Sequence, residues 1–587
     1  MMYIIISLIL ALVFAGMLTV KGEDSVISIV GGIICFLFFG AINYFAMPVL
    51  AWGYWGILFE LFIIVVSAAV ISSAIYEGWN WQCWVATCYT IFMLILAFSS
   101  SEMFNSRSYQ QMMSVEEVEF SNFAEDVNII PVEKMVVADY DLARKVVEDR
   151  LEEDPGLGSR CFVGNMTMQN LTGSFTINDG IELTFNDDLV WVAPLEHTGF
   201  FKWVNNDYTP GYMLVYANDP TKTYLITKVN GKDLKLRYLE TGCFGDDIER
   251  HIRTNGYASQ GLTEHNFEID FNGQPHWVLC NYEPTIGFSG GKDSKGVITV
   301  NIQTGEVNQY AMDEAPEWVD HIQPEYFVSE QIRCWGEYKL GFWNSVFAEI
   351  DVQVPTPGMV LVYSDGQSYW YTGIQSAGGD SATSGFVLVN ARTKEAKYYR
   401  VSGVNELEAK SIAEDQNFAK AASYYATSPV LYNVRGIPTY FMTLKGSSGN
   451  VTGYAFVAVT NRQAVGVGSS KREAETNYLQ SLRRTSNDTI TDGPVVTVEV
   501  KSFTVRDITL EGNVYYILFN EVKGKEFTGS SEFFRELKWT KPNNRVNVSY
   551  SEGSSDVILL DSFDNLDFEL IGHIRLVVGH HFAYPIA

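Results

Sequence analysis

The first hundred residues almost lack charged side chains. They contain one basic residue, Lys21, and four acidic residues, Glu23, Asp24, Glu60 and Glu77. A helix needs about 20 apolar residues to cross the hydrocarbon core of a bilayer, and that core excludes charge. This stretch is therefore too poor in charge for a water-soluble domain, and we predict a transmembrane region over residues 1–104.

Basic residues are also scarce in the rest of the chain. The 587 residues carry 41 Lys and Arg against 69 Asp and Glu, which gives a net charge of −28. A field of this sign repels the phosphates of nucleic acids and anionic lipid surfaces. We therefore expect no nucleic-acid partner.

Cysteine and histidine are sparse, and neither forms a metal-binding pattern. The seven cysteines are Cys35, Cys83, Cys88, Cys161, Cys243, Cys280 and Cys334. The first three lie in or beside apolar segments, and the other four are too far apart for a CxxC or zinc-ribbon pattern. Those four can form two disulfides or none. The eight histidines include no HExxH motif, so we predict no metal and no cofactor.

Catalytic signatures are missing as well. The chain has no GxSxG nucleophile elbow. The segment Ser289-Gly-Gly-Lys-Asp-Ser294 matches the SGGxDS signature of the PP-loop ATP pyrophosphatases. That loop lies between a strand and a helix, whereas the β-forming residues Gly296–Val300 follow it here. We therefore predict no catalytic residue and expect a protein that is not an enzyme.

Four long apolar runs predict the membrane spans. They are Met1–Val20, Val26–Met47, Val49–Tyr76 and Cys83–Ser100. Only Pro48 separates the second run from the third, so three spans are the alternative. The first run has no basic start and is followed at once by further spans, which argues against a cleaved signal peptide.

Glu60 lies inside the third run. An ionisable group in hydrocarbon either serves a proton or ion pathway or is neutralised by a neighbour. The first interpretation makes the protein a membrane enzyme or transporter that uses the helix bundle around Glu60. Because the four runs hold no second acid to receive a proton, we favour a buried acid that a neighbour such as Tyr54 satisfies.

The charges beside the spans predict the orientation of the chain. Lys21 is the only basic residue in a short loop, and the positive-inside rule places it in the cytoplasm. With four spans, the soluble part then lies outside the cytoplasm. We therefore expect an integral membrane protein with an extracytoplasmic soluble part.

Three stretches of the soluble part resemble one another. Each has a β-rich run, a tight turn, an aromatic-rich second strand and a Gly/Ser loop before a third strand. The turns lie at Asn272-Gly273, Asp365-Gly366 and Arg435-Gly436. A helical stretch precedes each set of strands, at Asp246–Thr254, Val328–Tyr338 and Glu406–Ala422.

This order predicts an α+β fold, with a helix packed on one face of each antiparallel sheet. We place the repeated modules at residues 229–320, 321–403 and 404–490. Residues 130–228 are predicted to be a degenerate first module, with a helix at Asp139–Glu153 and strands at Gly180–Phe185, Val190–Ala193 and Gly211–Tyr216.

Five short strands predict a small barrel of the OB type over residues 491–570. They are Val495–Val505, Asn513–Phe519, Lys525–Thr528, Arg545–Tyr550 and Asp556–Leu560. The C-terminal tail, residues 571–587, is apolar. We expect this tail to dock on its own soluble domain or on a partner subunit, because burial of its side chains is favourable.

The strand and turn at Gly296-Val-Ile-Thr-Val-Asn-Ile-Gln-Thr-Gly-Glu-Val307 resemble those of the PepSY-type domain, a small extracytoplasmic module. With Pro194–Trp203, Ala315–Asp320 and Pro429–Thr443, the chain resembles large, mostly uncharacterised membrane-anchored proteins of bacteria and their phages. Their soluble part is built of PepSY-like repeats. The resemblance covers about residues 130–570 and implies the bacterial inner membrane or cell envelope.

We therefore predict a membrane-anchored, non-enzymatic binding or scaffolding protein. Its expected partners are the lipid bilayer, other envelope or virion proteins, and further copies of the chain. By analogy with PepSY modules, a regulator or inhibitor of a peptidase is the alternative.

Overall fold

The computed structural model describes residues 2–18, 25–76, 78–364, 366–378, 382–485, 500–550 and 557–568. The chain forms two compact units. Unit one comprises Met1–Ala409 and Thr427–Thr439, and unit two comprises Lys410–Ala426 and Tyr440–Ala587. The boundary between the units therefore falls inside the predicted module 404–490.

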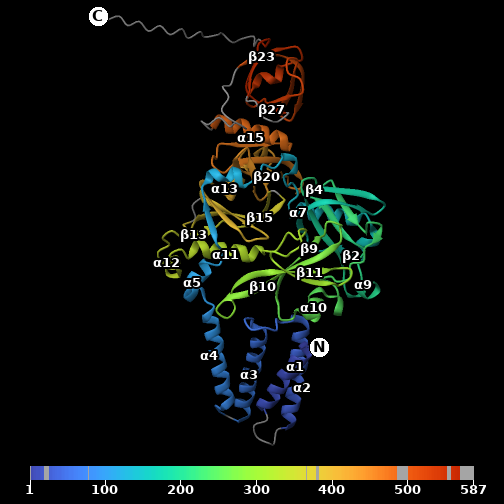
Figure 1. Ribbon diagram of the computed structural model, residues 1–587, viewed down its shortest axis with the longest axis vertical. Helices are drawn as coiled ribbons and strands as arrows, with labels where there is room; N and C mark the ends of the chain where they lie inside the picture. Colours follow the sequence, from blue (N-terminus) through green and yellow to red (C-terminus); the bar gives the residue numbers. More distant parts are fainter. Residues whose placement is uncertain are drawn as a thin grey trace, which may run out of the picture. The chain divides into compact units, whose positions relative to one another are not determined.

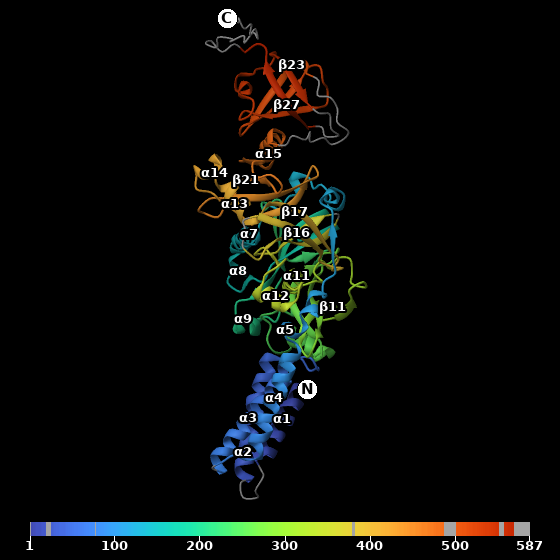
Figure 2. The ribbon, with the colours of Figure 1, turned by 90° about the vertical axis from the view of Figure 1, so that its left-hand side faces the viewer.

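Four apolar helices form a bundle at the start of unit one (Figures 1 and 2). They are α1 (Met2–Leu18), α2 (Ser25–Ala46), α3 (Trp55–Tyr76) and α4 (Trp81–Ser99). Three segments of the described chain are long and apolar enough to cross a membrane: Ser28–Ala46, Trp55–Ala74 and Trp81–Gln110. α1 is shorter, at 17 residues, so its passage through the membrane stays a prediction.

The break between α2 and α3 is wider than predicted. α2 ends at Ala46, and residues 47–54 are not α-helical. Pro48 explains the end of α2, because proline disfavours helical geometry in the residue before it, and Met47 has a φ of 40°. α4 begins where the Asn80 side chain accepts a hydrogen bond from the Cys83 amide.

A connecting segment leads from the bundle to the sheets of unit one. It contains α5 (Glu102–Gln110), β1 (Val115–Val118), η1 (Phe120–Asn122), α6 (Phe123–Asp126) and η2 (Val132–Lys134). β1 pairs in parallel with β17 (Ala396–Val404), and Val115 lies opposite Ala396. This strand was not predicted from the sequence.

The next sheet has seven strands in the order β6-β5-β4-β3-β7-β8, with β2 paired to β4. The strands are β2 (Cys161–Val163), β3 (Thr167–Ile177), β4 (Ile181–His197), β5 (Tyr212–Tyr216), β6 (Thr223–Ile226), β7 (Lys228–Val229) and β8 (Lys232–Asp233). Its helices are α7 (Tyr140–Glu152), α8 (Pro155–Gly158) and α9 (Phe200–Asn205). Asp139 caps α7 as predicted, and its carboxylate accepts from the Leu142 amide at 3.0 Å. The two strands predicted at 180–185 and 190–193 are one strand, β4.

A four-stranded antiparallel sheet follows, in the order β12-β11-β10-β9. Its strands are β9 (Gly261–Ile269), β10 (Pro275–Ile286), β11 (Gly290–Asn301) and β12 (Val307–Ala311), preceded by η3 (Phe244–Asp246), α10 (Ile248–Ile252) and η4 (Arg253–Tyr257). Phe267, Trp277 and Leu279 of this sheet are buried in one core with Val192 and Leu214 of the seven-stranded sheet. The two sheets therefore form one packed body.

The last sheet of unit one has six strands, β1-β17-β16-β15-β13, with β14 also paired to β15. Its further strands are β13 (Gln353–Pro355), β14 (Val360–Ser364), β15 (Gln367–Ser376) and β16 (Ala382–Asn390). α11 (Glu325–Glu337) packs its apolar face, including Val328 and Ile332, on this sheet, and α12 (Phe342–Phe347) follows. β19 (Val430–Val434) also belongs to unit one.

The turn glycines adopt the left-handed conformation that the sequence predicts. Gly273, Gly366 and Gly436 have φ values of 77°, 67° and 83°. Residues with a Cβ rarely adopt such values. Each glycine is therefore required by its turn, although membership of these sheets in a PepSY-like repeat stays a prediction.

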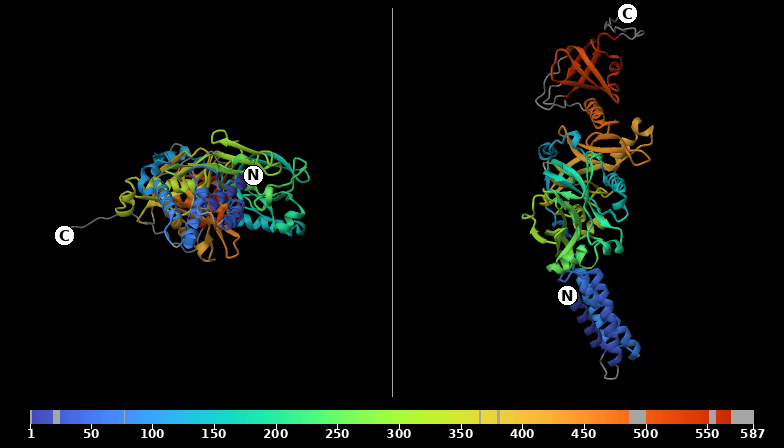
Figure 3. Two further views of the ribbon diagram at one scale, coloured as in Figure 1. Left: turned by 90° about the horizontal axis from the view of Figure 1, so that it is seen from below. Right: turned by 90° about the vertical axis from the view of Figure 1, so that its right-hand side faces the viewer.

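Unit two contains a sheet in the order β18-β20-β21-β22 and a closed barrel in the order β23-β24-β25-β27-β26 (Figure 3). Its strands are β18 (Tyr425–Ala426), β20 (Ile437–Lys445), β21 (Val451–Ala458), β22 (Val465–Gly468), β23 (Lys501–Glu511), β24 (Val514–Phe519), β25 (Glu526–Ser530), β26 (Arg545–Tyr550) and β27 (Val557–Asn565). Its helices are α14 (Asn417–Lys420), α15 (Lys471–Thr485) and η5 (Arg535–Trp539). Both α13 (Glu406–Glu414) and β20 cross the unit boundary. The predicted helix 406–422 is thus broken in two, and the predicted five-stranded barrel is confirmed.

Two further expectations concern the cysteines and the C-terminal tail. All seven cysteines lie in the described part of the chain, and each is a free thiol. The alternative without disulfides is therefore the one observed. The tail, residues 571–587, lies outside the described residues.

Candidate functional site

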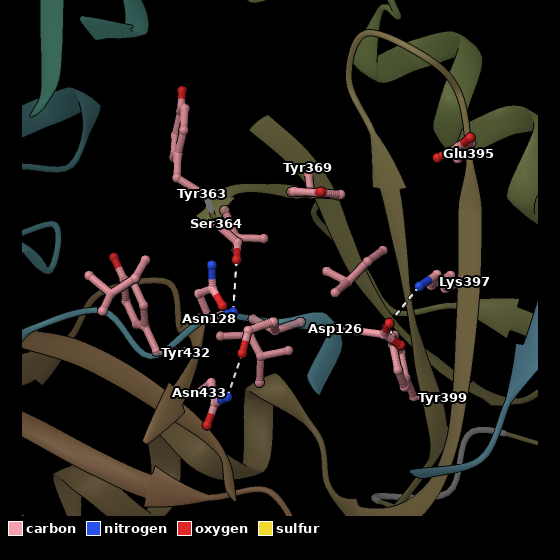
Figure 4. A pocket seen from close by; sticks show the side chains of 15 residues that line it. Asp126, Asn128, Tyr363, Ser364, Tyr369, Glu395, Lys397, Tyr399, Tyr432 and Asn433 are labelled. Atoms are coloured by element: carbon pink, nitrogen blue, oxygen red, sulfur yellow. Dashed lines mark hydrogen bonds and ion pairs between the residues drawn. The ribbon is translucent and has the colours of Figure 1, made fainter. Parts of the chain in front are cut away.

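A small cavity lies in unit one where the connecting segment crosses the six-stranded sheet (Figure 4). Its volume is about 100 Å³. Residues from α6, β14 to β17 and β19 line it, four of them tyrosines: Tyr363, Tyr369, Tyr399 and Tyr432. The cavity is a candidate ligand site, because it combines aromatic walls with a few polar groups.

Asp126 is one of three charged residues that line this cavity, with Glu395 and Lys397. Its carboxylate contacts Lys397 Nζ at 2.7 Å and accepts a hydrogen bond from the Tyr399 hydroxyl at 2.8 Å. Burial and the hydrogen bond to Asp126 raise the pKa of Tyr399 well above its usual range. Asp126 is therefore paired already and serves to hold α6 against β17.

The opposite wall fixes the backbone that follows Asp126. The Asn128 amide donates to Ser364 Oγ at 2.9 Å, and the Asn433 side chain donates to the Val127 carbonyl (Figure 4). The Val136 amide donates to the Tyr432 hydroxyl at 3.0 Å. Burial raises the pKa of Tyr432 to about 12.

The size of the cavity limits its chemistry. Small-molecule sites usually enclose about 300–1,000 Å³, and a water molecule occupies about 30 Å³ of liquid. A space of about 100 Å³ admits a few waters or one small polar group. The cavity therefore acts as a joint between the connecting segment and the sheet.

A second cavity, of about 190 Å³, lies where α5 meets α11. Glu102, Glu330 and Cys334 bring their ligand atoms close enough together there to hold a metal ion. Arg333 already neutralises the two carboxylates. Its Nη2 lies 2.6 Å from Glu102 Oε1, and it also forms an ion pair with Glu330. Burial raises the pKa of Cys334 to about 12, so the thiol keeps its proton, whereas metals bind the thiolate. This cluster is an ion-paired helix contact.

The SGGKDS segment borders the same cavity but forms a β-hairpin. Gly290 begins β11, which pairs with β10 as far as Ile286 opposite Gly290. A strand therefore takes the place of the helix that a pyrophosphate-binding loop requires. Ser289 Oγ accepts a hydrogen bond from Trp55 Nε1 of α3 at 2.7 Å.

The tip of this hairpin contacts the apolar helix bundle. Phe288 is buried and lies edge-on to Trp52 and Trp55, with ring centroids 5.0 and 4.9 Å away. The amides of Phe288 and Ser289 both donate to Ser100 Oγ, at 2.9 Å each. We call Trp52, Trp55, Ser100, Phe288 and Ser289 the hairpin lock.

Backbone contacts extend the hairpin lock. The Leu50 amide donates to the Ala258 carbonyl, and the Tyr54 hydroxyl donates to the Tyr282 carbonyl, both at 2.8 Å. The expectation that Tyr54 satisfies Glu60 is therefore wrong. Because Tyr54 lies in the break before α3, its ring reaches the soluble sheet instead of the bundle interior.

Glu60 has different neighbours from those predicted. Asn43 Nδ2 of α2 lies 3.3 Å from Glu60 Oε2, and the same nitrogen lies 3.2 Å from Ser7 Oγ of α1. All three side chains are buried. An isolated asparagine inside an apolar run was the sequence signal for this contact, and the prediction overlooked it.

Two histidines of unit one are bound to carboxylates. His321 Nδ1 lies 3.0 Å from Glu268 Oε1 in a fully buried contact. His265 lies between Glu240 and Glu249, at 3.0 and 3.3 Å. Burial alone would lower the pKa of His265, but the two carboxylates raise it to about 9. Both histidines therefore bind segments of unit one together.

Exposed aromatic residues gather on two short helices of unit one. On α12, Trp343 and Phe347 stack with centroids 5.7 Å apart, and Phe347 is 76% exposed. On α9, Phe201 is 79% exposed beside Phe200. Figure 1 shows α12 and α9 on opposite flanks of unit one. Clusters of this kind are unusual on monomers and often mark interaction surfaces.

Comparison with protein-family models and with curated proteins finds no match for this chain. The PepSY resemblance therefore stays a prediction.

Proposed function

We propose that this protein is a membrane-anchored, non-enzymatic scaffold that holds the sheets of unit one against its helix bundle and binds other proteins. The hairpin lock is the observation that carries this proposal. A flexible tether would need only a linker after the last span. This chain instead returns residues 286–290 to the bundle and buries Phe288 between two tryptophans.

The chemistry of the cavities favours binding over catalysis. Both cavities described above are smaller than usual substrate sites, and Asp126 in the first and Glu102 in the second are each paired with a basic side chain. Burial raises the pKa of Cys280 and of Cys334 to about 12, which makes them poor nucleophiles at neutral pH.

The exposed aromatic residues of α12 and α9 are the proposed binding surfaces. Interface cores are rich in aromatic side chains, which bury a large area on contact. The expected partners are other proteins of a bacterial envelope or a virion, or further copies of this chain. We also propose that the modules are PepSY-like, that the barrel is of the OB type and that the soluble part lies outside the cytoplasm.

The test is capture of partners by the full chain from membranes after chemical cross-linking. Trp343 and Phe347 are replaced together by serine, and exposed Ile181 and Phe162 of the seven-stranded sheet are replaced together as the matched control. We expect the wild type and the control to retain one stoichiometric partner and W343S/F347S to lose it, with unchanged melting temperatures.

Two outcomes would contradict the proposal in different ways. Equal recovery by all three proteins would remove α12 as the binding surface. A peptidase recovered in stoichiometric amount, with altered activity, would replace scaffolding by the regulatory alternative.

A further inference from the structure

Three buried polar side chains meet inside the apolar bundle. Ser7, Asn43 and Glu60 come from α1, α2 and α3 and are 0%, 1% and 4% exposed. Asn43 Nδ2 donates to Ser7 Oγ at 3.2 Å and to Glu60 Oε2 at 3.3 Å. Ser7 Oγ in turn donates to the Tyr3 carbonyl at 2.9 Å. The cluster is thus a defined polar site between three apolar helices.

Two oxygens of this site lack a hydrogen-bond partner in the described chain: Asn43 Oδ1 and Glu60 Oε1. Both are acceptors when Glu60 is ionised, and buried acceptors are normally satisfied. The four helices contain no Lys, Arg or His that could neutralise the carboxylate. Within these four described helices, no basic side chain therefore neutralises an ionised Glu60.

We propose that Ser7, Asn43 and Glu60 form an intramembrane binding site for one small monovalent cation, a proton or a sodium ion. Either occupant binds between the two unpartnered oxygens. A bound proton lets Glu60 donate to Asn43 Oδ1, which completes the reciprocal acid–amide pair that the Asn43 Nδ2 contact begins. A sodium ion is coordinated by both oxygens, because hard cations prefer oxygen ligands.

The charge of the site selects a monovalent occupant. Glu60 supplies the single negative charge, so a divalent ion would leave a net positive charge in a region that excludes charge. This proposal is independent of the scaffolding function, since it concerns only the bundle.

The test uses dicyclohexylcarbodiimide, an apolar reagent that attacks protonated carboxyl groups from the lipid phase. The carboxyl oxygen bonds to the carbodiimide carbon and its proton moves to nitrogen. The acyl group then migrates from oxygen to nitrogen to give a stable N-acylurea. The full chain in liposomes is treated in choline chloride and in sodium chloride of equal ionic strength, between pH 5 and 8, and the adduct is located by peptide mass analysis.

In choline we expect the reagent to label Glu60 of the wild type and to leave E60Q unlabelled. The control is Q82L, which changes a separate polar contact where Gln82 donates to the Met17 carbonyl. Its labelling should equal that of the wild type. Sodium that lowers labelling several-fold, with protection lost in N43L, identifies sodium as the occupant. Labelling that is equal in sodium and choline identifies the proton. No labelling in choline at any pH would overturn the site.

Thermal melting gives a second reading that does not depend on the reagent. E60Q retains donor and acceptor groups facing Asn43, so its melting temperature in choline should stay within a few degrees of the wild type. A large loss in E60Q would show that the bundle requires the carboxylate charge itself, which would also overturn the proposal.

Discussion

Buried acids are satisfied differently in the sheets of unit one and in its apolar helix bundle. Glu268, on β9, accepts hydrogen bonds from the Asp320 amide at 2.9 Å, the His321 amide at 3.3 Å and the His321 ring at 3.0 Å. Glu60, in the bundle, accepts one bond from Asn43. Irregular backbone offers free amides, whereas those inside a helix are already bonded to carbonyls. An acid between helices must therefore find a side chain or an ion.

The largest expected effect comes from removing the acid in the sheets. In Glu268→Leu the His321 ring and two backbone amides lose their acceptor in a closed interior, so we expect the free energy of unfolding to fall by about 3–5 kcal/mol. Thermal melting of the detergent-solubilised chain measures it. Glu283→Gln, whose ion pair with Lys295 is exposed, should change stability by less than about 0.5 kcal/mol. Equal effects of the two variants would remove the contrast.

The junction between the two regions provides the next test. Phe288→Ala leaves a hole between Trp52 and Trp55, and such truncations cost about 3 kcal/mol or more. We expect faster hydrogen exchange of residues 47–54 and 286–290. Phe271→Ala, at a partly exposed turn, should leave that exchange unchanged. Unaltered protection in F288A would mean that the backbone contacts of Leu50 and Tyr54 hold this junction without the Phe288 ring.

The ion pairs of His265 make the stability of the sheets depend on pH. The pKa of His265 is raised to about 9 by Glu240 and Glu249, above the ordinary value of about 6.5. Its charged form therefore stabilises the fold fully below pH 6.5, and this stability is lost as the pH rises towards 9. At pH 6 we expect His265→Gln to have a free energy of unfolding about 2 kcal/mol below that of the wild type, measured by thermal melting. This difference in stability should vanish near pH 9.5. A difference independent of pH would show that His265 acts by packing alone.

The smallest effect concerns turn geometry, where charge plays no part. A Cβ at Gly273 would lie 2.7 Å from Phe175 Cδ2, whereas one at Gly436 would lie 3.6 Å from Ala124. Both glycines have positive φ. We expect Gly273→Val to cost about 2 kcal/mol and Gly436→Val about 1 kcal/mol in chemical denaturation. Wild-type stability of both variants would show that neither turn needs glycine.

Local sequence pattern predicted the elements better than their contacts. The second and fourth apolar runs match α2 and α4 within two residues at each end, because length and apolarity are properties of one segment. The glycine turns and the existence of five barrel strands follow from short-range chemistry in the same way, although β23 and β27 continue six and five residues beyond their predicted ends.

The missed features all join distant residues. Asp126 meets Lys397, Ser100 meets Phe288, and β1 pairs with β17. Nothing in the sequence near either partner specifies the other, since the fold alone brings them together. The pairing of Asn43 with Glu60 is an intermediate case, because both residues stand out in apolar runs but their helical register decides whether they touch.

The hairpin lock also imposes an order on biosynthesis. Trp52, Trp55 and Ser100 leave the ribosome long before Phe288 and Ser289, and β1 is made far ahead of β17. Chains fold as they emerge, from the N-terminus onward. The bundle is therefore made before the hairpin that contacts it, and β1 before the strand that pairs with it. A chain that stops before residue 286 would contain the whole helix bundle. It would lack the hairpin whose Phe288 and Ser289 contact that bundle.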